Sequence, residues 1–342
     1  MTTVVPQRTQ APSRAPSRFH PGGFALRDTW FPLVHTQHVG RRPLRRAMHG
    51  EPVILWRDGA CVRATEDMPD TAPQHRRQGE LTGGTGDYIT HERYGYTWVW
   101  YGDPRNASPD LIPHVPHLPA DGMAKWFQRS LTFDCSYELV AENLLDLTHA
   151  DFLHSTLTGD SLSEDDVVEV ESTSEVVTMI RTAHGRPIPD AQKAMAKGAT
   201  TQNIRVVTVT HVRSGVCVLH GDFNPGMSMR MLHPCNPETP TRTRTPVTYN
   251  PTYMPAIGRM LFPFATHIVG RQDNWAVRKQ NANYLDAGDD RDLSSRFDKA
   301  GLRYRKVYAA LVARQQSGDY SYLDDGDPGR DITEVLGINS RA

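Results

Sequence analysis

The sequence is poor in cysteine, and its cysteines are not spaced for pairing or for metal binding. Only four of the 342 residues are cysteine, namely Cys61, Cys135, Cys217 and Cys235. No Cys-x-x-Cys or Cys-x-His pair occurs among them, which argues against a disulfide scaffold and against a thiolate-ligated metal cluster. The simplest interpretation is a protein of a reducing, cytoplasmic compartment.

The sequence also lacks an excess of one charge and a long apolar run. Its 38 Lys and Arg residues nearly balance 39 Asp and Glu residues, for a formal net charge of −1. No whole-protein field therefore recruits nucleic acid or an anionic membrane. No apolar run approaches the roughly 20 residues that a bilayer span needs. With 38% hydrophobic and 23% charged residues, we expect a soluble protein of one large or two ordinary domains.

Residues 1–23 are predicted to form an N-terminal tail. Residues 1–18 are rich in Arg and Ser and contain no acidic residue, a composition that is also typical of a transit peptide. Pro6, Pro12 and Pro16 oppose the amphipathic helix that such a peptide needs. A disordered tail is therefore the prediction.

Hydrophobic patterning divides the remaining chain into zones. Residues 24–103 read as short alternating strands separated by turn residues, which predicts a small all-β domain. Residues 104–125 are rich in Pro and suit a connector. Residues 126–317 mix strand-like and helical runs, which predicts an α+β domain on an antiparallel sheet, followed by a C-terminal tail over 318–342. Strands are expected at 30–34, 52–57, 88–92, 96–103, 131–139, 167–172, 175–182, 204–212 and 216–223, and helices at 142–154, from about 262, and at 292–316.

The segment 142–154, which reads ENLLDLTHADFLH, carries the strongest sign of chemistry. Asp146 and His149 are three residues apart, which places them on one face of a helix. His149 and His154 are five apart, roughly 140° around an ideal helix. Both therefore reach one metal ion only if the helix widens or ends between them.

Two interpretations of these histidines are open from the spacing. Two imidazoles and a distant carboxylate form the face that binds Fe(II) and leaves positions open for O2 and substrate. Alternatively, two histidines at a helix end form hydrogen bonds to neighbouring carboxylates and bind no metal.

The segment resembles the mononuclear-iron motif of Rieske non-haem iron oxygenases, the α-subunits of ring-hydroxylating and demethylating enzymes. That motif, N-x-x-D-x-x-H-x-x-F-x-H, is filled here by Asn143, Asp146, His149, Phe152 and His154. The resemblance implies iron ligation by the two histidines and catalytic roles for Asp146 and Asn143.

The resemblance extends over most of residues 24–316. Residues 28–57 are similar to the first strands of the family's Rieske domain, and residues 97–104 to its closing strand. The stretch VGRQDNWAVRKQ resembles the family segment that supplies the carboxylate ligand, which implies Asp273 as the third iron ligand. An Asp before an Asn is also a common turn pair, so this alternative stays open.

The substrate pocket is indicated only by resemblance. NPETPTRT resembles the family's P-E-T turn beside the pocket, which implies that Arg244 or Thr245 contacts substrate, and Phe264 stands where the family often has a pocket aromatic. Arg244 would suit an anionic group through a bidentate contact. Arg242 and Arg244 alternate on one strand face, and exposure of both to solvent is the competing interpretation.

The ligands of the family's [2Fe–2S] cluster are missing from the sequence. The family binds that cluster through a Cys-x-His and a later Cys-x-x-His. In an alignment without gaps, Pro69 takes the place of the cysteine of the first motif, and Thr71 takes the place of its histidine. The second motif is deleted. His75 and His91 remain, with no cysteine beside them. We therefore expect a degenerate Rieske-like β domain without a cluster.

In the family, the aspartate at the position of Asp146 bridges an iron-ligating histidine to a cluster histidine of the neighbouring subunit. Without the cluster ligands, Asp146 has no such histidine to bridge to. A supporting role remains, in which the Asp146 carboxylate accepts a hydrogen bond from His149 and fixes its tautomer.

These residues and the resemblance together predict a mononuclear non-haem Fe(II) enzyme, an oxygenase-like oxidoreductase. Its expected substrates are O2 and a small organic molecule, aromatic or from specialised metabolism. The alternatives are a subunit that receives electrons from a separate Rieske protein or reductase, a redox-neutral Lewis-acid iron enzyme, and a non-catalytic partner subunit. A homo-oligomer, in the family's usual form a trimer, is expected, with no nucleic-acid or membrane partner.

Overall fold

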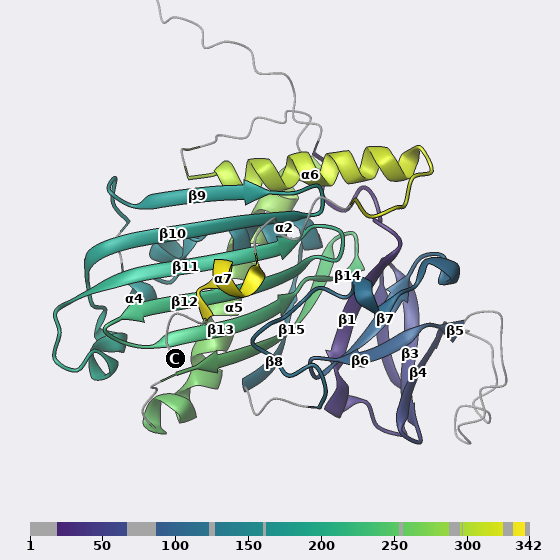
Figure 1. The fold of residues 1–342 in the computed structure, drawn as a ribbon, viewed down its shortest axis with the longest axis horizontal. Coiled ribbons are helices and arrows are strands. Elements are labelled where there is room, and N and C mark those ends of the chain that lie inside the picture. Colours follow the sequence, from purple (N-terminus) through teal and green to yellow (C-terminus); the bar gives the residue numbers. More distant parts are fainter. Residues whose placement is uncertain are drawn as a thin grey trace, which may run out of the picture.

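The computed structural model describes residues 19–66, 87–122, 127–159, 162–252, 256–286, 295, 297–323 and 331–338. Figure 1 shows a large sheet with helices behind it and along one edge, and a smaller group of N-terminal strands at its end. The strand pairs are antiparallel throughout. The predicted α+β class with an antiparallel sheet is confirmed.

The N-terminal strands are β1 (Thr29–His35), β2 (Leu44–Met48), β3 (Glu51–Asp58), β4 (Cys61–Glu66), β5 (Asp87–Tyr88), β6 (Thr90–Arg93) and β7 (Tyr96–Tyr101), with a 3-10 turn at Thr36–His38. They form one sheet of order β1-β7-β6 and another of order β2-β3-β4-β5. All six side chains of β7 are buried. Because side chains alternate along a strand, Trp98 and Trp100 pack into one cluster while Val99 and Tyr101 pack into another.

The large sheet has the order β14-β15-β13-β12-β11-β10-β9, and β8 pairs with β15. Its strands are β8 (Phe127–Phe133), β9 (Val167–Ser172), β10 (Val176–Pro187), β11 (Thr201–His211), β12 (Val216–Asn224), β13 (Ser228–Pro234), β14 (Asn236–Thr239) and β15 (Arg242–Pro251). The strand predicted at 131–139 ends at Phe133, because Tyr137 and Leu139 already belong to a helix that buries them against the sheet.

The helices are α2 (Tyr137–Leu145), α3 (His149–Leu153), α4 (Ser155–Thr158), α5 (Ala256–Asp286), α6 (Lys299–Gln316) and α7 (Ile332–Leu336), with 3-10 turns at Pro104–Asn106, Pro109–Leu111 and Asp190–Met195. Helix α5 begins six residues before the predicted start near Phe262 and contains Pro263, whose ring removes one helical N–H donor. Over the described residues, no helix combines the length and the apolar character that a membrane span requires.

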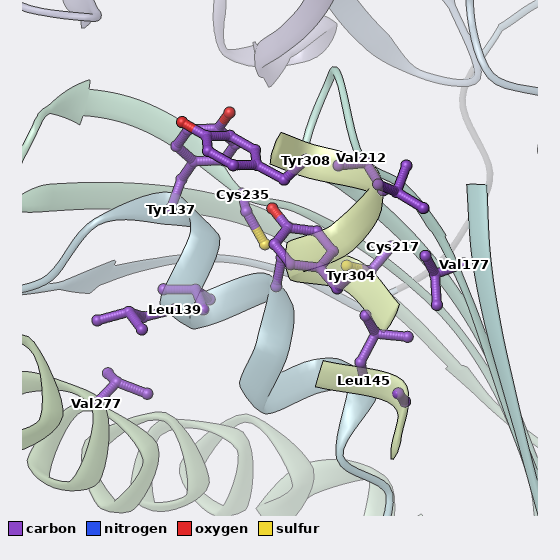
Figure 2. Close-up of a cluster of buried hydrophobic side chains, with 14 of the residues drawn as sticks. Tyr137, Leu139, Leu145, Val177, Val212, Cys217, Cys235, Val277, Tyr304 and Tyr308 are labelled. Carbon is purple, nitrogen blue, oxygen red and sulfur yellow. The ribbon is translucent and has the colours of Figure 1, made fainter. Parts of the chain in front are cut away.

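Helices α2, α5 and α6 share one hydrophobic core with a face of the large sheet (Figure 2). In β12, Cys217 and Leu219 face these helices, whereas Val216 and Val218 face the opposite side. Three of the four cysteines are therefore core side chains, because Cys135 and Cys235 are buried in the same cluster as Cys217.

The opposite face of the large sheet joins the N-terminal strands. Trp98 lies in one cluster with Val218 of β12 and with α7 residues. Polar contacts reinforce this junction: His49 donates its backbone N–H to the Pro237 carbonyl at 2.6 Å, and Asn236 Nδ2 donates to the Pro32 carbonyl at 2.7 Å. The two groups of strands are thus packed as one body.

Candidate metal centre

The chain turns sharply between α2 and α3, and the turn is built by Asp146. Helix α2 ends at Leu145, and Asp146 leaves the helical region with φ −77° and ψ 87°. Its Oδ1 accepts hydrogen bonds from the Thr148 backbone N–H at 3.0 Å and from the Thr148 hydroxyl at 2.6 Å. Asp side chains that bond to nearby backbone compete with helix continuation, so a new short helix starts at His149.

The second interruption lies at His154. Helix α3 ends at Leu153, and His154 has φ −121° and ψ 24°, outside the helical region. The expectation that the helix must widen or end between the two histidines is therefore confirmed. The break turns both imidazoles toward the same point, which five residues of regular helix do not do.

Asp273 of α5 meets these imidazoles. Its Oδ1 lies 2.9 Å from Nε2 of His154 and 3.5 Å from Nε2 of His149. The three ligand atoms all lie within 4.8 Å of one another. Asp273 is only 7% exposed and His154 4%, so the group is formed by tertiary packing and not by a surface coincidence.

The other ring nitrogens are held by neighbouring acceptors. His154 Nδ1 donates to Oε1 of Gln272 at 2.8 Å, and His149 Nδ1 donates to the backbone carbonyl of Asp146. These bonds leave both Nε2 atoms for a ligand. The expected partner of His149 is thus corrected: the Asp146 carbonyl accepts the bond, because its carboxylate is already engaged by Thr148.

Electrostatics favour a charged carboxylate at this site. Burial acts to raise the pKa of Asp273, but the hydrogen bond with His154, the two imidazoles and the Asn143 side chain together hold that pKa below its usual value. Burial acts to lower the pKa of His154, and its bond to Asp273 raises the pKa above the usual value. Asn143 is thus brought to the group through Asp273.

The donor set fits a divalent iron ion. Ligand atoms in adjacent positions around an ion, with bonds of about 2.1 Å, lie about 3 Å apart. The separations of 2.9 and 3.5 Å from Asp273 are close to this value. Two neutral imidazoles and one carboxylate are the ligands of the facial arrangement that leaves positions open on iron.

A histidine of the sheet lies near this group, and sequence reasoning missed it. His233 of β13 is buried and interacts electrostatically with Asp273. Among the described residues, its Nε2 has no hydrogen-bond partner. Burial lowers the pKa of His233 to about 4, so its ring is neutral at neutral pH. Tyr249 of β15 packs edge-on against His233, with ring centroids 5.1 Å apart, and against Phe262, with ring centroids 5.6 Å apart. The one available signal was a histidine four residues before Pro237 of the P-E-T turn.

A cleft of about 460 Å³ lies next to the ligand residues, because its lining includes Leu153, which precedes His154, and Gln272, which precedes Asp273. It is lined by residues of α3 and α5, which are Phe152, Leu153, Ile268, Arg271, Gln272 and Trp275. Gln272 both lines this cleft and bonds to His154. Phe152, the remaining motif residue, is 68% exposed.

The two predicted substrate residues lie elsewhere in the fold. Arg244 donates to Glu238 of the P-E-T turn and to Ser130 Oγ at 3.4 Å, and its charge interacts with Arg46 of β2. Phe264 is 68% exposed, on the outer side of α5. No hydrogen bond, ion pair or ring contact among the described residues links either side chain to the three ligand residues. The aromatic that faces the sheet is Phe262, 8% exposed.

The expected loss of the cluster ligands falls mostly outside the described residues. Pro69, Thr71 and His75 lie there. His91 is described in β6, where its ring lies 6.3 Å from that of Trp30. Within the described ranges, the group formed by His149, His154 and Asp273 is the one set of three or more metal-ligating side chains.

Residues 133–314 match the family model of the vanillate O-demethylase oxygenase C-terminal domain. The vanillate O-demethylase oxygenase subunit of a Pseudomonas species is 31% identical over 205 residues, which are 50% of this chain and 57% of that subunit. The oxygenase component of chloroacetanilide N-alkylformylase from Rhizorhabdus wittichii is 27% identical over 209 residues, 54% of this chain and 53% of that component. The chain thus matches about half the length of these relatives.

Solved structures share the fold over a longer stretch. A crystal structure of dicamba monooxygenase bound to 3,6-dichlorosalicylic acid has a TM-score of 0.73 and covers 85% of this chain and 99% of that chain. Its sequence identity is 19%, so this likeness concerns the fold, which includes the N-terminal strands.

Proposed function

The chain belongs to the family of vanillate O-demethylase oxygenase C-terminal domains, whose match covers more than half of it, and on this premise we propose an O2-dependent oxidoreductase with one non-haem iron(II). The iron ligands are His149, His154 and Asp273. The observation that carries the proposal is the convergence of three ligand atoms within 4.8 Å from α3, its C-cap and α5. A solved dicamba monooxygenase with non-haem iron shares the fold.

Each residue around the ion has a task that its contacts define. Iron(II), when bound, supplies open positions at which O2 and substrate meet and a metal that changes its oxidation state. Gln272 and the Asp146 carbonyl hold the Nδ1 protons of the two imidazoles, which directs both Nε2 lone pairs inward. Asn143 orients the Asp273 carboxylate through its side chain. Burial of Asp273 and His154 keeps bulk water from the ligands.

The substrate is a small aromatic molecule that lies between the ligands and the sheet. His233, Tyr249 and Phe262 present a neutral imidazole, a phenol and an apolar ring there. A buried Nε2 without a partner is costly unless a ligand group bonds to it, so the substrate should carry a polar substituent. The relatives are named for vanillate, a chloroacetanilide, dicamba and toluene-4-sulfonate, which supports an aromatic substrate class.

The chain is proposed to lack a [2Fe–2S] cluster and to take its electrons from the substrate. This rests on the sequence, which has no cysteine from Val62 to Asp134. Residues 24–103 are then a Rieske-like domain without a cluster, joined by residues 104–125 to a catalytic domain over 126–317. A cytoplasmic homotrimer is the proposed form.

A second candidate differs in the electron source. Relatives are named as an oxygenase component or an iron-sulfur subunit. Both names denote one protein of a multi-protein system. The exposed cleft next to Gln272 also offers a surface one side chain away from His154. On this reading, a separate Rieske protein or reductase delivers electrons to the iron.

Metal and sulfide analysis tests the proposal directly. Protein purified anaerobically and loaded with Fe(II) should hold about one iron per chain and no acid-labile sulfide. Two further irons per chain with labile sulfide would contradict the missing cluster, and no iron would contradict the metal centre. Turnover of aromatic acids with O2 alone supports the substrate as electron source. Turnover that starts only after a Rieske protein and its reductase are added supports the second candidate.

A further inference from the structure

The segment that carries both histidines has little stability of its own. Helix α3 has five residues, and its N-cap Thr148 makes no side-chain capping bond. Helices this short are unstable in isolation. Their position must therefore be set by contacts with the rest of the protein.

The strongest such contact is made by Arg181, in the middle of strand β10. Its side chain is 3% exposed. One terminal nitrogen donates to the Leu147 carbonyl at 3.1 Å and to Asp151 Oδ1 at 2.9 Å, and the other donates to Asp151 Oδ2 at 2.6 Å. Leu147 lies two residues before His149 and Asp151 two residues after it. The guanidinium thus binds the chain on both sides of the proposed ligand His149.

Every donor of the guanidinium is used. The two remaining N–H groups donate to Oδ2 of Asp166 at 3.0 and 2.7 Å, and Asp166 is itself bonded by Arg186. Five N–H donors in a rigid fork are the full capacity of an arginine. Lysine retains the charge but cannot reproduce this fork. Two aspartates and two arginines thus form a charge-balanced network, which reaches α3 at Asp151.

We propose that Arg181 is a positioning residue for the metal centre, which sets the direction of His149 by fixing Leu147 and Asp151. The inference rests on the proposed function, because it assigns Arg181 a role in metal affinity beyond its role in folding. Arg181 touches neither substrate nor metal. It acts through the orientation of the imidazole, where a small displacement changes the strength of coordination.

Arg213 provides a matched control. Its side chain is also 3% exposed, it contacts both carboxylate oxygens of Glu175, and it donates to the carbonyls of Tyr320 and Ser321 at 2.8 and 3.0 Å. None of these partners belongs to α3 or α5. Arg181→Lys and Arg213→Lys therefore remove similar buried forks, one beside the ligand segment and one away from it.

The experiment measures Co(II) binding through its visible d–d absorption, together with the thermal midpoint of each metal-free variant. Arg181→Lys should weaken Co(II) binding about 10–100-fold and alter the d–d spectrum, as changes to groups that orient ligands do. Arg213→Lys should lower the thermal midpoint comparably, with unchanged affinity and spectrum. Wild-type affinity and spectrum in Arg181→Lys, or equal weakening in both variants, would overturn the proposal.

A second variant covers the case in which Arg181→Lys does not fold. Asp151→Asn keeps the shape of the side chain and removes its charge. It should weaken Co(II) binding with the same spectral change, and wild-type behaviour would overturn the proposal. If wild-type protein binds no Co(II), the proposed metal centre fails by itself. Amide hydrogen exchange then tests whether Arg181 fixes the segment. Faster exchange of residues 147–154 in Asp151→Asn than in Arg213→Lys supports the proposal, and equal exchange overturns it.

Discussion

The N-terminal strands and the half of the molecule that holds the candidate metal centre use their residues in opposite ways. In the N-terminal strands, large aromatics such as Trp30 and Trp98 are at most 1% exposed, and burial is spread over every residue of β7. In the other half, three polar atoms from α3, its C-cap and α5 determine the candidate site. Packing is distributed over many replaceable contacts, whereas coordination depends on a few atoms. A packed core therefore tolerates the change of single side chains better than a metal centre tolerates the loss of one ligand.

The largest effect is expected from removing one ligand. Asp273→Ala and His154→Ala should each abolish stoichiometric iron binding while the far-UV circular dichroism stays that of the wild type. Two protein ligands hold iron much more weakly than three. Iron per chain after anaerobic reconstitution is the measurement. His91→Ala, in β6, is the control and should retain iron; loss of iron there would give the N-terminal strands a part in metal binding.

A large aromatic of the N-terminal strands should affect stability and not metal affinity. Trp98 is fully buried in the cluster shared with Val218, so Trp98→Ala should lower the free energy of unfolding by about 3–5 kcal/mol. Because the cluster joins both halves, urea unfolding should remain one transition. Trp275, 54% exposed, is the control, and its alanine variant should change stability by no more than about 0.5 kcal/mol. Two separate transitions in Trp98→Ala would show that the halves fold independently.

Groups that hold the imidazoles should have intermediate effects. Gln272→Ala removes the acceptor of His154 Nδ1 and should weaken iron binding about 10–100-fold. Asp146→Asn keeps an Oδ1 acceptor for Thr148 and should bind iron nearly as the wild type does. Asp146→Ala removes the turn bond and should approach the Gln272 variant. Isothermal titration with Fe(II) under argon distinguishes the three. A strong loss of iron affinity in Asp146→Asn would show that the charge of the Asp146 carboxylate contributes to iron binding.

The junction between the two halves should be sensitive to acid. Burial, with the nearby charge of His38, lowers the pKa of His35 to about 3, and its Nε2 lies 3.3 Å from the Thr248 hydroxyl of β15. This folded value lies below that of an unfolded histidine, about 6.5. Stability is therefore complete above that pH and is lost as the pH falls toward 3, by about 2 kcal/mol at pH 5. Urea midpoints at pH 7.5 and pH 5 should differ less in His35→Gln than in the wild type, and His184→Gln, on an exposed part of β10, should leave the difference unchanged.

The smallest effect is expected from the aromatic that the sequence favoured. Phe264→Ala should leave kcat/KM for an aromatic acid unchanged, because that ring points to solvent. Phe262→Ala removes the ring against Tyr249 and should raise KM. If Phe264→Ala raises KM and Phe262→Ala does not, the substrate lies on the outer side of α5.

Much of the fold and part of the site were accessible from the sequence. The strands at 30–34 and 96–103 and the histidine segment could be predicted because each depends on a local pattern. Aromatic and β-branched residues bounded by turn residues mark a strand, and a dense motif marks a ligand segment. Asp273 was reached by resemblance. A hydrogen bond between Asp146 and His149 is present, but the Asp146 carbonyl accepts it, and the carboxylate accepts a hydrogen bond from Thr148 instead.

By itself, then, the sequence determined the α+β class, because hydrophobic periodicity is written along the chain. Its resemblance to a known motif indicated which residues could meet at a metal ion. Only the tertiary structure decided that His149, His154 and Asp273 converge, that His233 lies near them, and that Arg181 holds the segment from β10. The contacts of Asp273 with the two histidines, of His233 with Asp273 and of Arg181 with the histidine segment join residues 30 or more positions apart. Which face of a helix or strand meets which depends on how whole layers pack, and no local pattern encodes that choice.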